Sequence, residues 1–128
     1  MSIADYLEPF SPDCNISIVG PFHPDPFIAD EPVIFVDRGT CARRNNEGLS
    51  VGDGDSFPGK LDITLNPDKD FSDLAFVLDA IPRQYSTVTL IGFLGGRRDH
   101  EYFNLGAAQR FLKNRDEPAR ICFDDAIF

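Results

Sequence analysis

Short apolar runs that end on glycine or aspartate are the feature that most constrains the fold of this chain. Four such runs are "NISIVG" (15–20), "VIFVD" (33–37), "EGLSVGD" (47–53) and "STVTLIG" (86–92). Runs of this length that are rich in Val and Ile predict strands, and continuous apolar runs are typical of strands buried on both faces of a parallel sheet. Two further strands are predicted by "KLDITLN" (60–66), where apolar and polar residues alternate, and by "ARICFDD" (119–125).

Helical spacing of apolar residues appears in two places between these strands. A helix is predicted from residue 71, because apolar residues at 71, 74, 78 and 81 lie three or four apart and Pro82 ends the run. A second helix is predicted over 99–114, with Leu105, Ala108 and Leu112 facing inward. Residues 1–14 predict a short helix or arm, and the prolines of 21–32 predict a loop.

Strands that alternate with helices and loops predict an α/β fold, a Rossmann-like three-layer sandwich with a mostly parallel sheet. The 128 residues are enough for one domain with a single core, but not for two full domains. In open α/β sheets, ligands bind beyond the carboxyl ends of the strands. Asp37, Asp53, Asp55 and the Gly95-Gly96 turn follow predicted strands, so they are expected to converge on one edge.

The charge balance argues against a nucleic-acid-binding surface. The chain carries a formal net charge of −9, whereas nucleic acids are bound by clustered Lys and Arg. The pairs Arg43-Arg44 and Arg97-Arg98 suit a small anionic ligand instead. Three cysteines without CxxC spacing predict reduced, mostly buried thiols rather than disulfides or a zinc site. No stretch approaches the ~20 apolar residues that cross a bilayer, and a cytoplasmic protein is expected.

The motif "GDGDS" places two carboxylates, Asp53 and Asp55, one residue apart. In extended backbone, residues two apart point to the same side, so the pair repels unless a cation lies between them. Magnesium prefers oxygen ligands and takes one or two protein carboxylates together with water and phosphate. A DxD in a loop is nevertheless more often a solvated turn than a metal site.

The acidic stretch "NPDKDFSDL" precedes the first predicted helix of the second half. Asp70 or Ser72 is a candidate N-cap, and Asp73 is expected in the first turn, where a carboxylate is favoured by the free amides and the dipole. In the functional interpretation, Asp73 joins the metal cluster or contacts a substrate hydroxyl.

The turn "FLGGRRDH" connects the fifth strand to the last helix. Gly95 and Gly96 let backbone amides approach a phosphate at a helix N-terminus, and Arg97 or Arg98 can bind its oxygens. Asp99 is equally well interpreted as an N-cap or as a nucleotide contact. His100 is interpreted as a surface residue at the helix start more readily than as a base.

Four ordered motifs, "VDRGT", "VGDGDS", "PDKDFSDL" and "LGGRRDH" followed by Asn104 and Leu105, resemble the N-terminal catalytic domain of thiamin pyrophosphokinase. The resemblance covers roughly residues 33–125. It implies that residues 1–128 are a single α/β nucleotide-binding domain that lacks the β-rich, thiamin-binding C-terminal domain of the family.

The family transfers the diphosphate of ATP to the hydroxyl of thiamin, giving thiamin diphosphate and AMP. The resemblance therefore implies Mg²⁺ as cofactor, ATP and thiamin as substrates, and a homodimer. The implied magnesium ligands are Asp37, Asp53, Asp55 and Asp73. The implied catalytic residues are Asp53, Asp55, Asp73 and Arg97, and the implied nucleotide contacts are Gly39, Ser56, Lys69, Gly95, Gly96, Arg97, Asp99 and His100.

The chain also departs from the family pattern. Arg38 replaces a glycine, and the segments between Asp37 and Gly52 and between Ser56 and Pro67 leave little room for helices. Either the chain is a piece of a longer enzyme, or it is a compact relative without the thiamin half. Three alternatives stay open: diphosphate transfer to another alcohol such as a hydroxymethyl-pterin, a non-catalytic nucleotide-binding module, and an α/β domain whose acids only cap helices.

Overall fold

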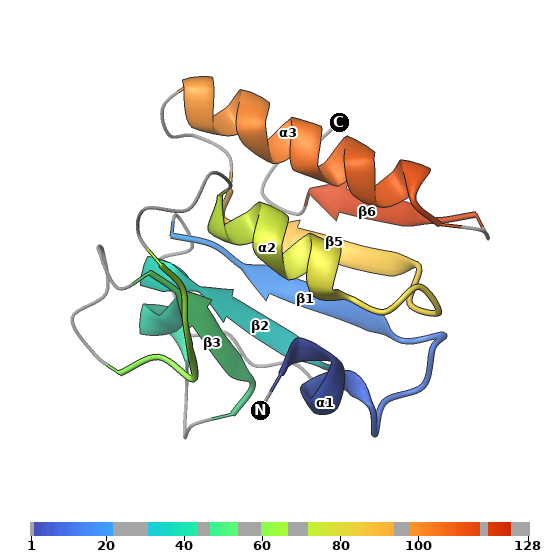
Figure 1. Ribbon diagram of the computed structural model, residues 1–128, viewed down its shortest axis with the longest axis horizontal. Helices are drawn as coiled ribbons and strands as arrows, with labels where there is room; N and C mark the ends of the chain where they lie inside the picture. The colour runs from blue at the N-terminus through green and yellow to red at the C-terminus, as the bar shows by residue number, and fades with distance from the viewer. Residues whose placement is uncertain are drawn as a thin grey trace.

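The described residues form one sheet of six parallel strands (Figure 1). The computed structural model describes residues 2–21, 31–43, 47–53, 60–66, 72–93, 98–115 and 118–123. The strands are β1 (Asn15–Val19), β2 (Val33–Val36), β3 (Leu49–Gly52), β4 (Ile63–Thr64), β5 (Thr87–Ile91) and β6 (Arg120–Phe123), and the helices are α1 (Ile3–Leu7), the 3-10 helix η1 (Asp37–Ala42), α2 (Asp73–Ala80) and α3 (Arg98–Lys113). The predicted α/β fold with a mostly parallel sheet is confirmed.

The strand order β4-β3-β2-β1-β5-β6 reverses direction beside β1. From β1 the chain steps outward through β2 and β3 to β4, and it then returns to the other side of β1 as β5. Parallel crossovers are right-handed, so connections that step in opposite directions lie on opposite faces of the sheet. The sheet therefore has a topological switch point between β1 and β5, where α/β folds bind their ligands.

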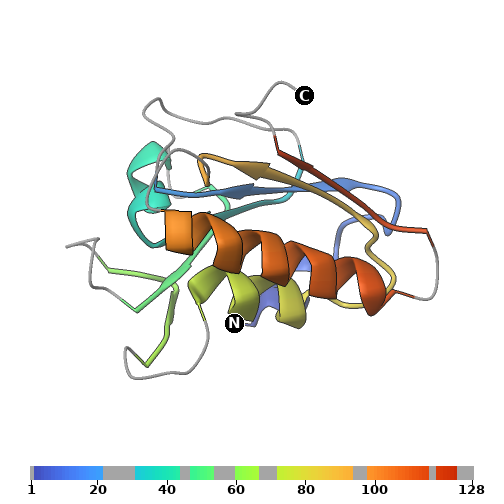
Figure 2. The same cartoon turned by 90° about the horizontal axis from the view of Figure 1, so that it is seen from above.

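The three α-helices lie on the same face of the sheet (Figure 2). Helices α2 and α3 belong to the two crossovers on the β5 side of the switch point, and α1 packs beside α2. Within the described parts of the connections from β1 to β4, η1 is the helix present. The second helical layer of the predicted three-layer sandwich is thus not found among the described residues. No helix in this part of the chain is both long and apolar enough to cross a membrane.

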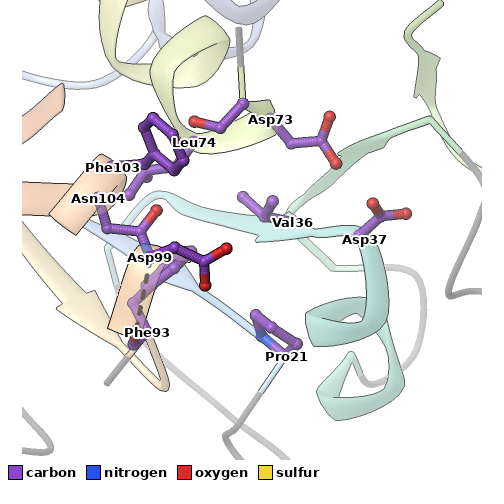
Figure 3. Close-up of a pocket in the computed structure, with 10 residues that line it drawn as sticks. Pro21, Val36, Asp37, Asp73, Leu74, Phe93, Asp99, Phe103 and Asn104 are labelled. Carbon is purple, nitrogen blue, oxygen red and sulfur yellow. Dashed lines mark hydrogen bonds between the residues drawn. The ribbon is translucent and has the colours of Figure 1, made fainter. Parts of the chain in front are cut away.

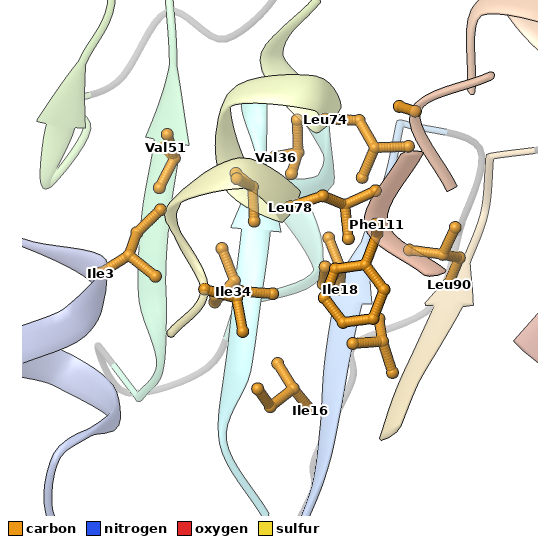
Figure 4. Close-up of a cluster of buried hydrophobic side chains, with 14 of the residues drawn as sticks. Ile3, Ile16, Ile18, Ile34, Val36, Val51, Leu74, Leu78, Leu90 and Phe111 are labelled. Atoms are coloured by element: carbon orange, nitrogen blue, oxygen red, sulfur yellow. The ribbon is translucent and has the colours of Figure 1, made fainter. Parts of the chain in front are cut away.

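The core fills the space between the sheet and these helices (Figure 4). Ile16, Ile18 and Ile34 of the central strands pack with Leu78 and Phe111 of α2 and α3, and all five side chains are almost fully buried. A smaller cluster on the opposite face contains Val19, Val33 and Phe35. Both faces of the central strands are therefore buried, as their continuous apolar runs predicted.

The predicted inward face of α3 is wrong at two of its three positions. Ala108 is buried, but Leu105 is 47% exposed and Leu112 is 40% exposed. Ala107 and Phe111 are buried instead. The predicted and the observed inward residues both have helical spacing. In the structure the side of α3 with the larger Phe111 ring faces the core, and the two leucines remain partly exposed.

Two other expectations from the sequence need correction. Cys41 and Cys122 are exposed and Cys14 is half-buried, so the cysteines are free thiols but not mostly buried. The Arg43 guanidinium donates to the carbonyl oxygens of Glu47 (3.0 Å) and Gly48 (3.1 Å) and forms an ion pair with Asp62 at 3.0 Å. The Arg43 side chain thus stabilises the loop before β3, and these donors are used there rather than for an anionic ligand.

Tyr85 provides a stability test of the packing between the N-terminal segment and the start of β5. Its side chain is 2% exposed, and its hydroxyl lies 2.6 Å from the carbonyl oxygen of Leu7 and 3.0 Å from that of Phe10. We expect Tyr85→Phe to lower the free energy of unfolding in urea by about 1–3 kcal/mol, because buried carbonyl groups lose their donor. Tyr102→Phe is the control, since Tyr102 is 71% exposed, and it should change little.

The buried hydroxyl of Tyr85 also predicts how the free energy of unfolding changes with pH. Burial raises the pKa of Tyr85 above its usual value of 10.0, with smaller contributions from the nearby Cys14 and Glu8. The unfolded chain then loses the phenol proton first, so stability is lost as the pH rises above about 10. The wild type should lose more stability between pH 9 and pH 11 than Tyr85→Phe. Equal losses would contradict this assignment.

Candidate active site

A cavity of about 360 Å³ lies at the carboxyl edge of the sheet, next to the switch point (Figure 3). It opens where three neighbouring strands end and where α2 and α3 begin. The residues that line it are Pro21, Val36, Asp37, Ser72, Asp73, Leu74, Phe93, Asp99, Phe103 and Asn104. Its volume is within the ~300–1,000 Å³ of small-molecule sites.

Three carboxylates meet at one side of this cavity. Asp37 directly follows β2, Asp53 directly follows the adjacent strand β3, and Asp73 is the first residue of α2. Each offers a carboxylate oxygen, these oxygens lie within 4.8 Å of one another, and the residues are half-buried. The structure thus brings together three of the four predicted magnesium ligands, while Asp55 lies outside the described residues. Metal binding by the group stays a prediction.

The backbone of Asp37 is unusual. Its φ of +48° makes it the one non-glycine residue with positive φ in the described part of the chain. Aspartate tolerates this left-handed region better than most residues, but the conformation persists only where its surroundings enforce it. The turn begins η1, and Gly39 lets η1 pack on β1, since a Cβ atom there would collide with the Val19 carbonyl oxygen. Gly39 therefore has a packing role, and its predicted nucleotide contact is untested.

The start of α2 positions Asp73. Ser72 is the N-cap, and its Oγ accepts a hydrogen bond from the amide of Ala75 at 3.1 Å. Of the two N-cap candidates in the sequence, the structure uses Ser72, while Asp70 lies outside the described residues. Asp73 is thus not needed as a cap, and Figure 3 shows its carboxylate turned toward Asp37. The helix N-terminus favours a negative charge at this position.

Asp99 lies on the other side of the cavity from Asp37 and Asp73 (Figure 3). Helix α3 begins at Arg98, so Asp99 is already inside the first turn and the N-cap interpretation is wrong. Asn104, one turn further on, donates from Nδ2 to the carbonyl oxygen of Phe93 at 3.4 Å. His100 belongs to the same first turn of α3. The nucleotide contacts predicted for Asp99 and His100 stay predictions.

Several predicted site residues cannot be placed. Ser56, Lys69, Gly95, Gly96 and Arg97 fall outside the described residues. Their predicted contacts with the nucleotide, and the catalytic role of Arg97, are therefore neither supported nor contradicted by the geometry.

The apolar walls of the cavity were missed by the sequence analysis. They come from Val36, Leu74, Phe93 and Phe103. Phe93 follows β5 just as Asp37 follows β2, and Phe103 lies four residues after Asp99, one helical turn away. Both positions can be read from the sequence, but apolar residues after a strand or along a helix are also typical of a hydrophobic core. Phe103 differs from a core residue, since it is 68% exposed at the cavity.

The electrostatics of the group favour a cation. Two like charges 4–5 Å apart repel by roughly 1 kcal/mol in bulk water and roughly 3–4 kcal/mol at an effective dielectric constant of about 20, and half-buried groups lie between these limits. A divalent cation replaces this repulsion with attraction, and a set of carboxylate oxygens is the donor chemistry of Mg²⁺, Mn²⁺ or Ca²⁺ rather than of zinc. The three residues therefore fit a hard divalent cation.

Comparison with known proteins finds matches among solved structures. No protein-family model and no curated protein matches the chain. Among solved structures, thiamin pyrophosphokinase from Geobacillus thermodenitrificans matches with a TM-score of 0.57 and 26% identity over 84% of this chain and 59% of that chain. The chain is similar to thiamin pyrophosphokinases.

A second thiamin pyrophosphokinase-like structure agrees in fold. The probable thiamine pyrophosphokinase from Staphylococcus saprophyticus matches with a TM-score of 0.54 and 24% identity, over 87% of this chain and 66% of that one. The chain thus spans less than two thirds of either of these two proteins.

The carboxylate group predicts a metal-dependent stability. In EDTA, Asp53→Asn should raise the free energy of unfolding by on the order of 1 kcal/mol, because it removes one of three mutually repelling charges. With millimolar Mg²⁺ the order should reverse, since the wild type gains stability by binding the ion. Urea titrations with and without Mg²⁺ measure both effects.

The control for this prediction is Asp79→Asn. Asp79 lies in α2, is about half exposed and forms a long ion pair with Arg110 at 3.7 Å. Its substitution should change stability little and equally in both solutions. A loss of stability for Asp53→Asn in EDTA would contradict the repulsion argument.

Proposed function

We propose that the chain is the magnesium–ATP part of a diphosphotransferase of the thiamin pyrophosphokinase type. The reaction transfers the diphosphate of ATP to the hydroxyl of thiamin and gives thiamin diphosphate and AMP. The observation that carries the proposal is the meeting of Asp37, Asp53 and Asp73 beside a cavity at the switch point. The similarity in fold to two thiamin pyrophosphokinases supports it.

Magnesium would be held by Asp37, Asp53 and Asp73, together with Asp55 from the same "GDGDS" motif. When bound there, the ion would neutralise charge on the ATP phosphates. The chain contributes rigidity, because two ligands follow paired strands and the third begins a capped helix. In phosphoryl transfer, catalysis comes mostly from such positioning and from charge neutralisation.

Asp73 would orient the acceptor hydroxyl. It lies where the carboxylate group meets the cavity, so an alcohol in the cavity has its oxygen near this side chain. The hydroxyl oxygen attacks the β-phosphorus in line and forms the new O–P bond, and Asp73 would accept the hydroxyl proton. The bond from the β-phosphorus to the oxygen that bridges to the α-phosphate breaks, and AMP leaves with that oxygen. Arg97 would stabilise the developing charge.

The cavity suits a molecule with a flat apolar part and polar ends. Leu74, Phe93 and Phe103 form its apolar walls, and carboxylates lie at opposite sides, with Asp99 facing Asp37 and Asp73. Aromatic and aliphatic walls bury the ring of a substrate and exclude water, while polar groups orient it. Asp99 would contact the nucleotide.

The acceptor alcohol, complete turnover, a cytoplasmic location and assembly as a homodimer are further parts of this proposal. They come from the sequence resemblance and from structures of which this chain spans about two thirds or less. Another alcohol acceptor and nucleotide binding without transfer are the outcomes that the test must separate from thiamin diphosphate synthesis.

The test is calorimetric titration of the chain with a non-hydrolysable ATP analogue, with and without Mg²⁺, followed by an assay for AMP release with thiamin or a hydroxymethyl-pterin. We expect binding that requires Mg²⁺ and that weakens at least tenfold (about 1.4 kcal/mol) in Asp73→Asn. Asp79→Asn, in the same helix, should bind like the wild type. Absence of Mg²⁺-dependent binding would overturn the proposal, and AMP release with one alcohol would identify the acceptor.

A further inference from the structure

Gly52, the first residue of "GDGDS", lies directly beside Asp37. The register of β2 and β3 pairs Ile34 with Leu49 and Val36 with Val51, so the next residues on the two strands, Asp37 and Gly52, are lateral neighbours. A Cβ atom on residue 52 would lie 2.6 Å from Oδ1 of Asp37, 2.7 Å from its Cγ and 3.0 Å from its Cα. The space that a side chain at position 52 would need is occupied by the Asp37 carboxylate.

Backbone conformation does not explain this glycine. The glycines with positive φ in the described part of the chain are Gly48 and Gly92, and Gly52 is not among them. Position 52 is therefore open to any L-residue as far as φ is concerned. The neighbouring carboxylate is what requires a residue without a side chain.

The backbones of both partners in this contact are held in place by the fold. Gly52 is held in the sheet by its pairing with Thr64 and by its carbonyl oxygen, which accepts from the Leu65 amide at 2.7 Å. Asp37 is held by a left-handed turn and by η1, whose Gly39 packs on the end of β1. A methyl group at position 52 must therefore displace the Asp37 side chain.

We infer that Gly52 is a positioning residue for the carboxylate group, and that its missing side chain is what allows Asp37 to stand beside Asp53 and Asp73. The functional meaning of this inference rests on the proposed metal site, whereas the contact between residues 52 and 37 does not. Gly52→Ala should thus separate the metal ligands without removing any of them.

The first arm of the test measures metal affinity. Binding of Mn²⁺, a spectroscopic substitute for Mg²⁺, is followed by the electron paramagnetic resonance signal of the free ion. We expect Gly52→Ala to weaken binding at least tenfold while the far-ultraviolet circular dichroism spectrum is kept. Gly106→Ala is the matched control, because a Cβ atom there meets nothing within 4 Å, and it should bind Mn²⁺ like the wild type. Unchanged affinity in Gly52→Ala would overturn the inference.

The second arm is independent of metal. Urea midpoints in EDTA are compared for the wild type, Gly52→Ala, Asp37→Gly and the double variant, since a double-mutant cycle isolates the contact between the two residues. The loss caused by Gly52→Ala should shrink in the Asp37→Gly background, where the carboxylate is gone. An equal loss in both backgrounds would overturn the inference. If the wild type binds no Mn²⁺, the proposed metal site fails, and this cycle still decides the role of Gly52.

Discussion

Parallel pairing of β1 with β2 on one side and with β5 on the other is the constraint on which the rest of the structure depends. Because all strands run the same way, every strand end that carries a polar residue faces the same edge of the sheet. Because the strand order reverses beside β1, the connections leave this edge in opposite directions and a cavity remains between them. The polar residues after β2 and β3, and the first turns of α2 and α3, are thereby brought to one place.

The same edge combines an unfavourable charge arrangement with rigid support. Three carboxylates within 4.8 Å of one another and a left-handed aspartate are features that lower the stability of a fold without a bound cation. The support comes from central strands with both faces buried, from a capped α2 and from glycines that let backbone and side chains approach closely. Local cost at a rigid edge is a recurrent feature of binding sites and supports the proposed cation site.

Sequence reasoning succeeded where a local signal and a long-range rule agreed. The apolar runs predicted the central strands, and the rule that parallel strands share their carboxyl edge predicted that Asp37 and Asp53 would meet. The N-cap signal at Ser72 was one of two candidates, and only the structure distinguished them. The ordered motifs predicted similarity to thiamin pyrophosphokinases, which the solved structures bear out at the level of the fold.

Sequence reasoning failed where the tertiary surroundings of a side chain decided its position. The apolar residues of α3 allow two inward faces, and the fit of Phe111 into the core decided between them. Arg43 was interpreted by its charge alone, although its donors satisfy nearby carbonyl oxygens and Asp62. Cys122 lies on β6, a strand at the edge of the sheet, where a small apolar residue need not be buried.

We propose that the carboxyl ends of β2 and β3 and the start of α2 form one cation site. The decisive measurement of this proposal is the amide NMR spectrum of the full chain at substoichiometric Mn²⁺, with the ATP analogue present. We expect the amide signals of Asp37, Asp53 and Asp73 to broaden most, while the signal of Asp79, six residues further along α2, broadens less. Broadening spread over the exposed acidic residues, or centred away from these three, would contradict it.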